Sequence, residues 1–341
     1  MEYRVLGGTG ISVSQFALGA MTFGEFANAD HDESIRMIHT ALDAGVNFID
    51  TADYYSLGES EQIVGKALKG RRDNVVVATK FFFPMGDDPN MRGGSPRWIK
   101  RAVEDSLRRL DTDYIDLYQM HRPDPHTDIE ETLSALTDLV RTGKIRAIGS
   151  STFPAEQIVE AQWAAEKHGY QRFRAEQPPY SILMRGIERD VLPTTQRYNM
   201  GVLTWSPLVG GWLSGRVSPA GATGQRAQMA GDIYDMSDPA NQTKLAAVEQ
   251  LSKLADDSGM SLPHMALAFV LAHPGVTSVI IGASKPQHLT DLLAGADIRL
   301  SEDVLDKIDE IVPPGVTLRQ RDSYYTPPAI AEKGLRRLAR R

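Results

Sequence analysis

The chain has 341 residues and a formal net charge of -7, with 42% hydrophobic and 24% charged residues. These proportions are typical of a globular protein and exclude a chain that is disordered over most of its length. The acidic balance argues against nucleic acid or an anionic membrane as a partner of the whole surface, and the lack of cysteine excludes disulfides and thiolate metal sites.

The start of the chain, residues 1–8, lacks the basic stretch and apolar run of a secretion signal, and no later apolar run is long enough to span a bilayer. A reducing compartment is compatible with the absence of cysteine. We therefore predict a cytoplasmic protein with no membrane partner and no nucleic-acid partner. The sequence leaves the formation of a homo-oligomer open.

Short apolar or β-branched runs alternate with longer amphipathic stretches, which is the pattern of repeated βα units. Tyr3–Val5, the glycine-rich residues 7–10 and Val13 predict an opening hairpin. Eight strands are then predicted at Phe16–Leu18, Phe48–Asp50, Val75–Thr79, Ile115–Tyr118, Ala147–Gly149, Arg174–Glu176, Gly201–Thr204 and Ser278–Ile281. Helices are predicted at His31–Ala44, Ser60–Lys69, Pro96–Arg109, Ile129–Thr142, Ala155–Gly169 and Pro286–Ala294. This order predicts an α/β fold, a (β/α)8 TIM barrel whose bottom the N-terminal β-hairpin plugs.

Two segments interrupt this alternation, residues 82–95 with Gly, Pro and Asp and residues 209–238 with Gly, Ala and Ser. Long irregular segments in a compact domain are usually functional, so we expect both to lie over the C-terminal face of the barrel. Residues 1–330 are predicted to form one barrel domain, and residues 331–341 a basic, solvated C-terminal tail.

Four polar side chains follow three successive predicted strands. Asp50 ends the second strand and Tyr55 lies just beyond it, while Lys80 follows the third strand and His121 the fourth. Each has an ordinary structural explanation by itself, as a helix cap, a packed ring, a lysine reaching solvent or a loop histidine. Because the working residues of a barrel lie at the carboxyl ends of its strands, the four together predict one catalytic site.

These residue types suit the reduction of a carbonyl group, whose oxygen becomes negative as it accepts hydride and needs a proton. Tyr55 would give that proton if its pKa of about 10 were lowered by two or three units, which takes about 3 to 4 kcal/mol. An ammonium about 4 Å away supplies about 4 kcal/mol at an effective dielectric of about 20, and Lys80 is predicted in that role. Asp50 would keep Lys80 charged, and His121 would direct the oxygen of a small-molecule carbonyl substrate.

The chain resembles the aldo-keto reductase family through Asn47–Tyr55, Ala78–Lys80 and Asp113–His121. The resemblance extends from Leu6 to Leu289 and is nearest the branch that contains potassium-channel β subunits and their bacterial relatives. It implies a nicotinamide cofactor, normally NADPH, extended across the barrel mouth. It requires no Gly-x-Gly-x-x-Gly fingerprint, and the chain has none.

The resemblance also implies which side chains contact the cofactor. Ser151, Thr152 and Gln177 match the groups that hold the nicotinamide carboxamide, and Trp205 matches the ring that stacks on it. Arg216 matches the cation at the pyrophosphate. The complete implied set is Met21, Thr22, Asp50, Ser151, Thr152, Gln177, Trp205, Ser206, Pro207, Leu208, Arg216, Gly282, Ser284, His288 and Asp291.

His288 stands where many members of the family carry an arginine. Arginine favours the 2′-phosphate of NADPH because its fork makes bidentate, charge-assisted hydrogen bonds. Its loss keeps NADH as an alternative cofactor, although Lys285, Arg226 or Arg216 would compensate. Thr152 and Leu292 likewise replace frequent asparagines.

Two other functions fit the same residues. Lys80 could form a Schiff base with a carbonyl substrate, as in an aldolase, and the resemblance to channel β subunits allows a redox-sensing, NADPH-binding regulatory subunit of a partner protein. No metal site is expected, because His121 and His126 lack a third ligand at metal spacing. The aromatic and apolar residues that would line a substrate pocket, or equally pack in loops, are Phe23, Phe81, Phe82, Met85, Trp98 and Trp212.

Overall fold

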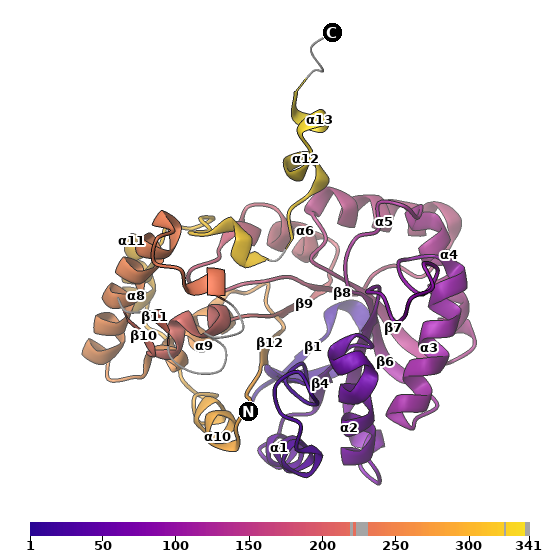
Figure 1. Ribbon diagram of the computed structural model, residues 1–341, viewed down its shortest axis with the longest axis horizontal. Coiled ribbons are helices and arrows are strands. Elements are labelled where there is room, and N and C mark those ends of the chain that lie inside the picture. Colours follow the sequence, from indigo (N-terminus) through magenta and orange to yellow (C-terminus); the bar gives the residue numbers. More distant parts are fainter. Residues whose placement is uncertain (219–220, 223–230, 324, 338–341) are drawn as a thin grey trace.

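The computed structural model describes residues 1–218, 221–222, 231–323 and 325–337, and its centre is a closed barrel of parallel strands (Figure 1). The strands of the barrel are β3 (Phe16–Gly19), β4 (Phe48–Asp50), β5 (Val76–Phe81), β6 (Ile115–Met120), β7 (Ile145–Ser151), β8 (Ala175–Gln177), β9 (Gly201–Thr204) and β12 (Ser278–Ile281). Each strand pairs with its neighbours in parallel, and β12 closes the ring by pairing with both β9 and β3. The predicted TIM barrel is confirmed, with β8 one residue later than expected.

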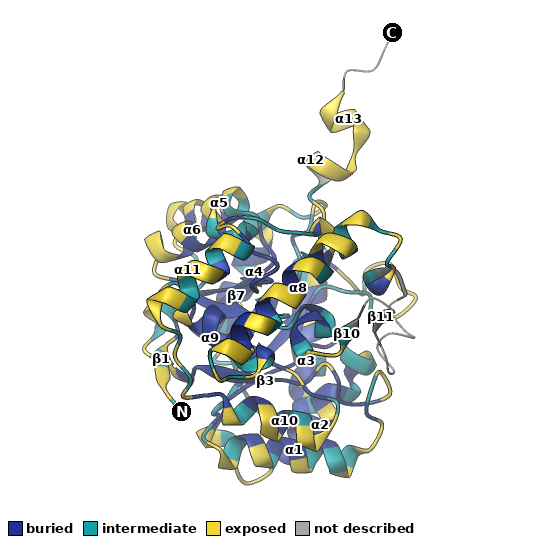
Figure 2. Cartoon of the chain, turned by 90° about the vertical axis from the view of Figure 1, so that its left-hand side faces the viewer, coloured by how far each residue is buried: buried dark blue, intermediate teal, exposed yellow. Residues whose placement is uncertain are grey.

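Helices surround the barrel, and all but the largely buried α9 have exposed outer faces and buried inner faces (Figure 2). They are α1 (His31–Asp43), α2 (Glu59–Ala67), α3 (Pro96–Leu110), α4 (Ile129–Arg141), α5 (Ala155–His168), α6 (Val191–Arg197), α8 (Pro239–Asp257), α9 (Leu262–Ala272), α10 (Pro286–Ala294) and α11 (Glu302–Ile311). The six predicted helices are present, with ends that differ by at most two residues. A side-chain cap starts α3, because Ser95 Oγ accepts a hydrogen bond from Trp98 N, and Pro96 occupies the first turn.

The hairpin consists of β1 (Tyr3–Val5) and β2 (Ser12–Ser14), paired antiparallel as predicted. It plugs the bottom of the barrel, since Leu6 and Val13 belong to the cluster of side chains inside it. Gly7 makes this contact possible. It has a φ of +52°, and a Cβ there would lie 2.7 Å from Arg174 O and from Gly201 N, at the starts of β8 and β9.

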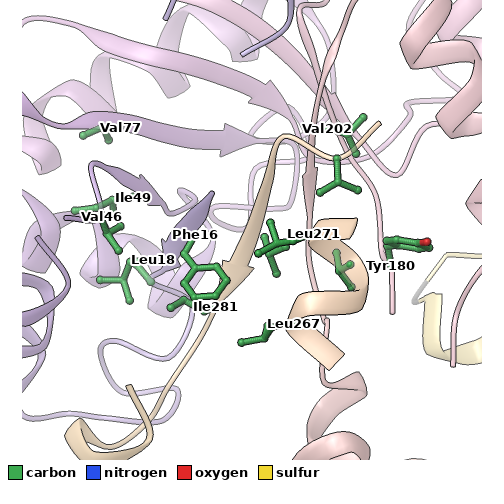
Figure 3. Packing of buried hydrophobic residues seen from close by; sticks show 14 of the residues in the cluster. Phe16, Leu18, Val46, Ile49, Val77, Tyr180, Val202, Leu267, Leu271 and Ile281 are labelled. Atoms are coloured by element: carbon green, nitrogen blue, oxygen red, sulfur yellow. The ribbon is translucent and has the colours of Figure 1, made fainter. Parts of the chain in front are cut away.

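The barrel interior is filled by one apolar side chain from each strand. This inner layer consists of Ala17, Phe48, Ala78, Leu117, Ala147, Ala175, Leu203 and Ile280. Intervening residues of the same strands face the helices. Figure 3 shows Phe16 of β3 and Ile281 of β12 in one cluster with Leu267 and Leu271 of α9. The alternation of a strand therefore separates two cores, one inside the barrel and one beneath its helices.

The two predicted irregular segments differ. Residues 82–95 contain no helix or strand, as expected. Residues 209–238 instead carry short elements, namely η5 (Val209–Ser214), the two-stranded pair β10 (Val217–Ser218) and β11 (Gly221–Ala222), and η6 (Gly231–Tyr234). Arg226, expected as a possible phosphate ligand, lies outside the described residues.

Two short helices end the described chain. They are α12 (Pro328–Ala331) and α13 (Lys333–Arg336), and they stand away from the barrel in both views (Figures 1 and 2). Ile330 and Leu335 are exposed there, at 55% and 63%.

Candidate active site

A polar layer lies directly above the apolar inner layer. Because side chains alternate along a strand, the residue two positions after each inner-layer residue again faces the barrel interior. At four strands this residue is polar. These four residues are Asp50 (β4), Lys80 (β5), Gln119 (β6) and Gln177 (β8). Glycine occupies the same position at three other strands, as Gly19, Gly149 and Gly282. A Cβ at Gly19 would lie 2.7 Å from Ile280 Cγ2 and one at Gly149 3.1 Å from Ala175 O, whereas one at Gly282 would meet no atom within 4 Å.

Asp50 is the centre of this layer. Its Oδ1 accepts a hydrogen bond from Lys80 Nζ at 2.5 Å. Its Oδ2 accepts from Gln177 Nε2 at 2.8 Å and from Gln119 Nε2 at 3.3 Å. The carboxylate is buried and fully hydrogen-bonded, so it holds the lysine in one position.

Lys80 has no exposed surface, and its ammonium makes three hydrogen bonds. Besides Asp50, Nζ donates to Thr51 O at 2.8 Å and to Tyr55 Oη at 3.2 Å. Burial would lower the pKa of Lys80, but Asp50 and Tyr55 raise it above its ordinary value. The residue is therefore a fixed cation beside a phenol.

Tyr55 begins η2 (Tyr55–Gly58), a turn directly after the β4 strand end. The next two residues, Ser56 and Leu57, have left-handed φ values of 47° and 51°, a conformation that is strained for residues other than glycine. Ser56 Oγ donates to Phe23 O at 3.2 Å, which ties the turn to the loop after β3. Tyr55 thus lies at the start of a strained turn that the Ser56 hydrogen bond connects to the loop after β3.

The pKa of Tyr55 differs from the sequence-based expectation. Burial raises it above its ordinary value of 10, and the lowering by Lys80 offsets this only in part. The expected lowered pKa is therefore wrong for this structure. The phenol is neutral at physiological pH, which is the state that a proton donor needs.

His121 follows β6 and faces the tyrosine. Its ring centroid lies 5.8 Å from that of Tyr55, edge to face, and 4.8 Å from that of Phe83. Burial, followed by Lys80 and Arg122, lowers its pKa well below the ordinary value, so the imidazole is neutral. Among the described residues its Nδ1 is buried without a hydrogen-bond partner.

The residues expected to hold a nicotinamide carboxamide gather beside this centre. Ser151 Oγ donates to Gln177 O at 2.9 Å, and Thr152 N donates to the same oxygen at 3.2 Å. Trp205 Nε1 also donates to Gln177 O, at 3.1 Å, and the indole is half-buried at the end of β9. Met21 is exposed, whereas Thr22 is buried and donates to Ala283 O at 2.8 Å.

The residues expected at the phosphates meet from distant parts of the chain. Arg216, after η5, lies 2.8 Å from His288 Nε2 on α10. Gly282 is exposed, and a Cβ there would meet no atom within 4 Å. A cationic side chain after β9 that contacts the helix after β12 suits a phosphate, since barrel proteins often bind phosphate after the last two strands. The residues present therefore fit a dinucleotide.

Other expected cofactor residues lie along the same edge. Ser206, Pro207 and Leu208 lead from Trp205 into η5, and Ser206 has a left-handed φ of 58°. Ser284 is half-buried after β12. Asp291 is exposed on α10, and its Oδ1 accepts a hydrogen bond from Gln287 at 2.8 Å.

Several site residues were missed by the sequence analysis. Gln119 was missed because it lies inside a strand rather than after it, although counting two residues from Leu117 would have found it. Phe83 and Arg122 were missed because only contacts between loops reveal them. The expected substrate-pocket residues Phe23, Phe81, Trp98 and Trp212 belong instead to the hydrophobic core, and Phe82 and Met85 pack against it.

This arrangement defines a class of protein: a (β/α)8 barrel with a lysine, aspartate and tyrosine acid-base centre at the carboxyl ends of its strands. The sequence profile described as the Aldo/keto reductase family matches residues 15–313. The chain belongs to the aldo/keto reductase family and is an oxidoreductase of that family, whose members are generally NAD(P)H-dependent.

The chain is similar along nearly its whole length to curated members of this family. It is 40% identical to the uncharacterized oxidoreductase YrpG of Bacillus subtilis, over 92% of this chain and 96% of that protein. It is 39% identical to the aldo-keto reductase YhdN of the same organism, over 86% and 88%. It is 36% identical to a putative voltage-gated potassium channel subunit beta of Schizosaccharomyces pombe, over 92% and 93%. The predicted branch of the family is confirmed.

Proposed function

We propose that this protein reduces an aldehyde or ketone to an alcohol, with NADPH as the preferred cofactor and NADH as the alternative, and that Tyr55 gives the proton. The contact between Lys80 Nζ and Tyr55 Oη at 3.2 Å carries the proposal. An ammonium can only donate hydrogen bonds, so the phenol oxygen accepts this one. The hydrogen of Tyr55 remains free for the substrate oxygen.

The lysine acts after the proton begins to leave. At 3.2 Å the attraction between an ammonium and a phenolate is about 5 kcal/mol at an effective dielectric of about 20. This stabilises the phenolate that proton transfer creates, while the neutral phenol gains little from it. Asp50 keeps the ammonium in place, and the neutral His121 donates a hydrogen bond to the carbonyl oxygen.

A reduced nicotinamide, when bound, supplies the hydride. On the protein side, Gln177, Ser151 and Thr152 hold its carboxamide, and Trp205 restricts its ring to one face. Ser206, Pro207, Leu208 and Arg216 would lie toward its pyrophosphate. The adenosine end and its phosphate would lie against Gly282, Ser284, His288 and Asp291. The contact between Arg216 and His288 at 2.8 Å supports this assignment.

A lysine aldolase is disfavoured by the state of Lys80. Schiff-base formation needs a neutral amine with a free lone pair. Here Nζ is buried, makes three hydrogen bonds, and has a pKa raised by Asp50 and Tyr55 that outweighs the effect of burial. Borohydride in the presence of a carbonyl substrate is therefore not expected to trap an adduct on Lys80.

A regulatory role toward a partner protein is the second candidate, supported by the fission-yeast relative whose name is that of a channel subunit. The presence of Asp50, Tyr55, Lys80 and His121 in one connected site favours turnover. Rapid reduction of a carbonyl compound would support the reductase, and recovery of a specific partner with only slow turnover would support regulation.

Two further assignments are proposals. We place the protein in the cytoplasm, supported by the absence of cysteine. We assign residues 331–341 to a basic tail outside the barrel domain of residues 1–330, supported by the position of α13 away from the barrel. Residues 338–341 of this assignment lie outside the described residues. In the described part of the chain, no helix combines the length and hydrophobicity needed to cross a membrane.

The substitution Tyr55→Phe tests the proposed function. We expect kcat for carbonyl reduction to fall by about 10²- to 10⁴-fold, since the proton donor is lost. The dissociation constant of the dinucleotide should change less than about threefold, because the ring remains. Turnover is followed by the absorbance of the reduced nicotinamide.

Tyr54→Phe is the matched control, because Tyr54 is the exposed neighbour of Tyr55 and has no contact with Lys80 among the described residues. It should retain full activity. Retained turnover in Tyr55→Phe would reject the proton-donor assignment.

A further inference from the structure

Arg122 lies at the entrance to the catalytic centre, directly after His121. Its side chain is half-buried, and Nη1 donates to His121 O at 2.6 Å. Its Cζ lies 5.7 Å from the ring centroid of Phe83 and 5.8 Å from that of Trp205. The guanidinium is thus held by two aromatic rings that come from the loops after β5 and β9.

No carboxylate of the described residues forms an ion pair with this guanidinium. Burial lowers the pKa of Arg122, and Tyr55, Glu176 and Tyr325 oppose this only electrostatically, without a hydrogen bond to it among the described residues. Glu176 has other partners, since its oxygens accept from Ser150 Oγ and Phe153 N. A partly buried charge without a counter-ion is unfavourable, and arginine does not lose its proton in proteins.

The charges of the site do not cancel. Lys80 is balanced by Asp50 at 2.5 Å, and His121 is neutral. Burial raises the pKa of Glu176 to about 7, so below that pH its carboxyl does not neutralise Arg122. Arg122 therefore adds about one positive charge near Tyr55 to a chain whose formal net charge is -7. The missing counter-ion is expected to arrive with a ligand.

We propose that Arg122 binds a carboxylate of the substrate, so that the protein acts on carbonyl compounds that carry a carboxylate group. The proposal rests on the reductase function proposed above. The planar fork of the guanidinium makes two parallel hydrogen bonds to a carboxylate. Phe83, which contacts both His121 and Arg122, would lie along the part of the substrate between its carbonyl and its carboxylate.

Matched acids and esters test this proposal. The probes are 4-oxobutanoate and 4-formylbenzoate, each compared with its methyl ester, so that the carbonyl is the same and only the charge differs. The wild-type protein with reduced dinucleotide should show kcat/KM at least about tenfold higher for the acid in one or both pairs. Benzoate, which cannot be reduced in this way, should inhibit competitively.

In Arg122→Met the fall in kcat/KM for the preferred acid should exceed the fall for its ester by about 30-fold, the size of one or two charge-assisted hydrogen bonds. Inhibition by benzoate should weaken by a similar factor. Arg146→Met is the matched control. Arg146 is exposed near the start of β7, at the opposite end of the barrel, and its substitution removes the same charge.

Equal kcat/KM for acid and ester in both wild-type pairs, or equal falls for both in Arg122→Met, would overturn the proposal. So would a weakening of dinucleotide binding in Arg122→Met large enough to explain the whole loss, because Arg122 would then serve the cofactor. Reduction of the esters without preference for the acids would leave the reductase function standing. If neither these compounds nor a wider set of neutral aldehydes and ketones is reduced, both proposals fail.

Discussion

The phenol of Tyr55 has a raised pKa, and yet it lies beside a cation. The raised pKa follows from burial, which disfavours every charge in the site unless a partner is within hydrogen-bond distance. Lys80 has such a partner in Asp50. The phenolate, which forms only as the proton leaves Tyr55, already has one in Lys80. The lysine therefore lowers the free energy of the product of proton transfer more than that of the resting state, and this difference is what accelerates a reaction.

A second buried acid, Glu176, lies on β8 next to Gln177. Burial raises its pKa to about 7 from an ordinary value of 4.5, although Ser150 and the amide of Phe153 act in the opposite direction. Between pH 4.5 and about pH 7, Glu176 keeps a proton in the folded protein that it has lost in the unfolded chain. Stability from this group is thus fully present below about pH 4.5 and is lost as the pH rises through about 7.

Glu176→Gln should remove this pH dependence. Between pH 5.5 and pH 8, the free energy of unfolding of the wild type should fall by roughly 2 kcal/mol more than that of the variant, because each pH unit of proton linkage is worth about 1.4 kcal/mol. Urea denaturation at the two pH values measures the difference. Glu160→Gln, at an exposed position on α5, should behave as the wild type does. Parallel curves for wild type and Glu176→Gln would refute the protonation.

At the scale of elements, the loop of residues 82–95 is fastened to the loop after β6 by Asp124. Its Oδ2 accepts hydrogen bonds from Gly94 N at 2.7 Å and Thr127 Oγ1 at 2.8 Å, and its Oδ1 accepts from His126 N at 3.0 Å. The first bond ties the loop that carries Phe83 to the loop that carries Arg122. One carboxylate therefore joins two of the loops that border the catalytic centre.

Asp124→Ala should lower the free energy of unfolding by about 2 kcal/mol, since hydrogen bonds to a charged group are lost. Limited proteolysis should cut within residues 82–95 faster than in the wild type. Asp87→Ala removes an exposed carboxylate from the same loop and should change neither measurement. An unchanged cleavage rate in Asp124→Ala would show that the loop is held by other contacts.

The strands of the barrel were predictable because short apolar runs alternate with amphipathic helices, and each strand places one side chain in the inner layer. The α9 helix was not predicted. It is apolar on nearly all sides, because it lies buried among other elements, so it has no polar face to reveal a helical period. Neighbouring elements, rather than the local pattern, determine its burial.

The same limit applies to the site. Asp50, Lys80 and His121 were found because each ends or follows an apolar run. Arg122 looks like a solvated residue in the sequence, and its place between Phe83 and Trp205 depends on three separate loops. The expectation of a lowered pKa for Tyr55 was wrong for a related reason. The sequence indicates a neighbouring cation but does not show how deeply the phenol is buried.

At the scale of the whole molecule, the C-terminal segment returns from α11 and is anchored on α8. Leu318 N donates to Leu183 O at 3.1 Å, and Arg319 pairs with Asp238 at 3.0 Å. Tyr325 follows this anchor and acts electrostatically on Arg122. Tyr325 thus lies in the surroundings of the catalytic centre, although it lies outside the eight βα units.

The centre of this anchor is a buried ion pair, in which Lys244 Nζ lies 2.5 Å from Asp322 Oδ2 and 4.1 Å from the ring centroid of Trp212. Arg319 Nη1 also pairs with Asp322, at 3.0 Å from Oδ1. Removal of Asp322 and removal of Lys244 should therefore change the stability by different amounts. Loss of Asp322 leaves the fully buried ammonium without its carboxylate, whereas loss of Lys244 leaves Asp322 with a second cation.

We expect Asp322→Ala to lower the free energy of unfolding by about 3 to 5 kcal/mol, the usual effect of removing one partner from a buried ion pair. Lys244→Met should have an effect of only about 1 to 2 kcal/mol, because an aliphatic chain of similar size still packs on Trp212 and the charge is gone. The double variant should then be more stable than Asp322→Ala alone, since it no longer buries an unpaired ammonium. Urea denaturation of the four proteins measures this cycle, and a double variant less stable than Asp322→Ala would show that the lysine stabilises the anchor by contacts other than this pair.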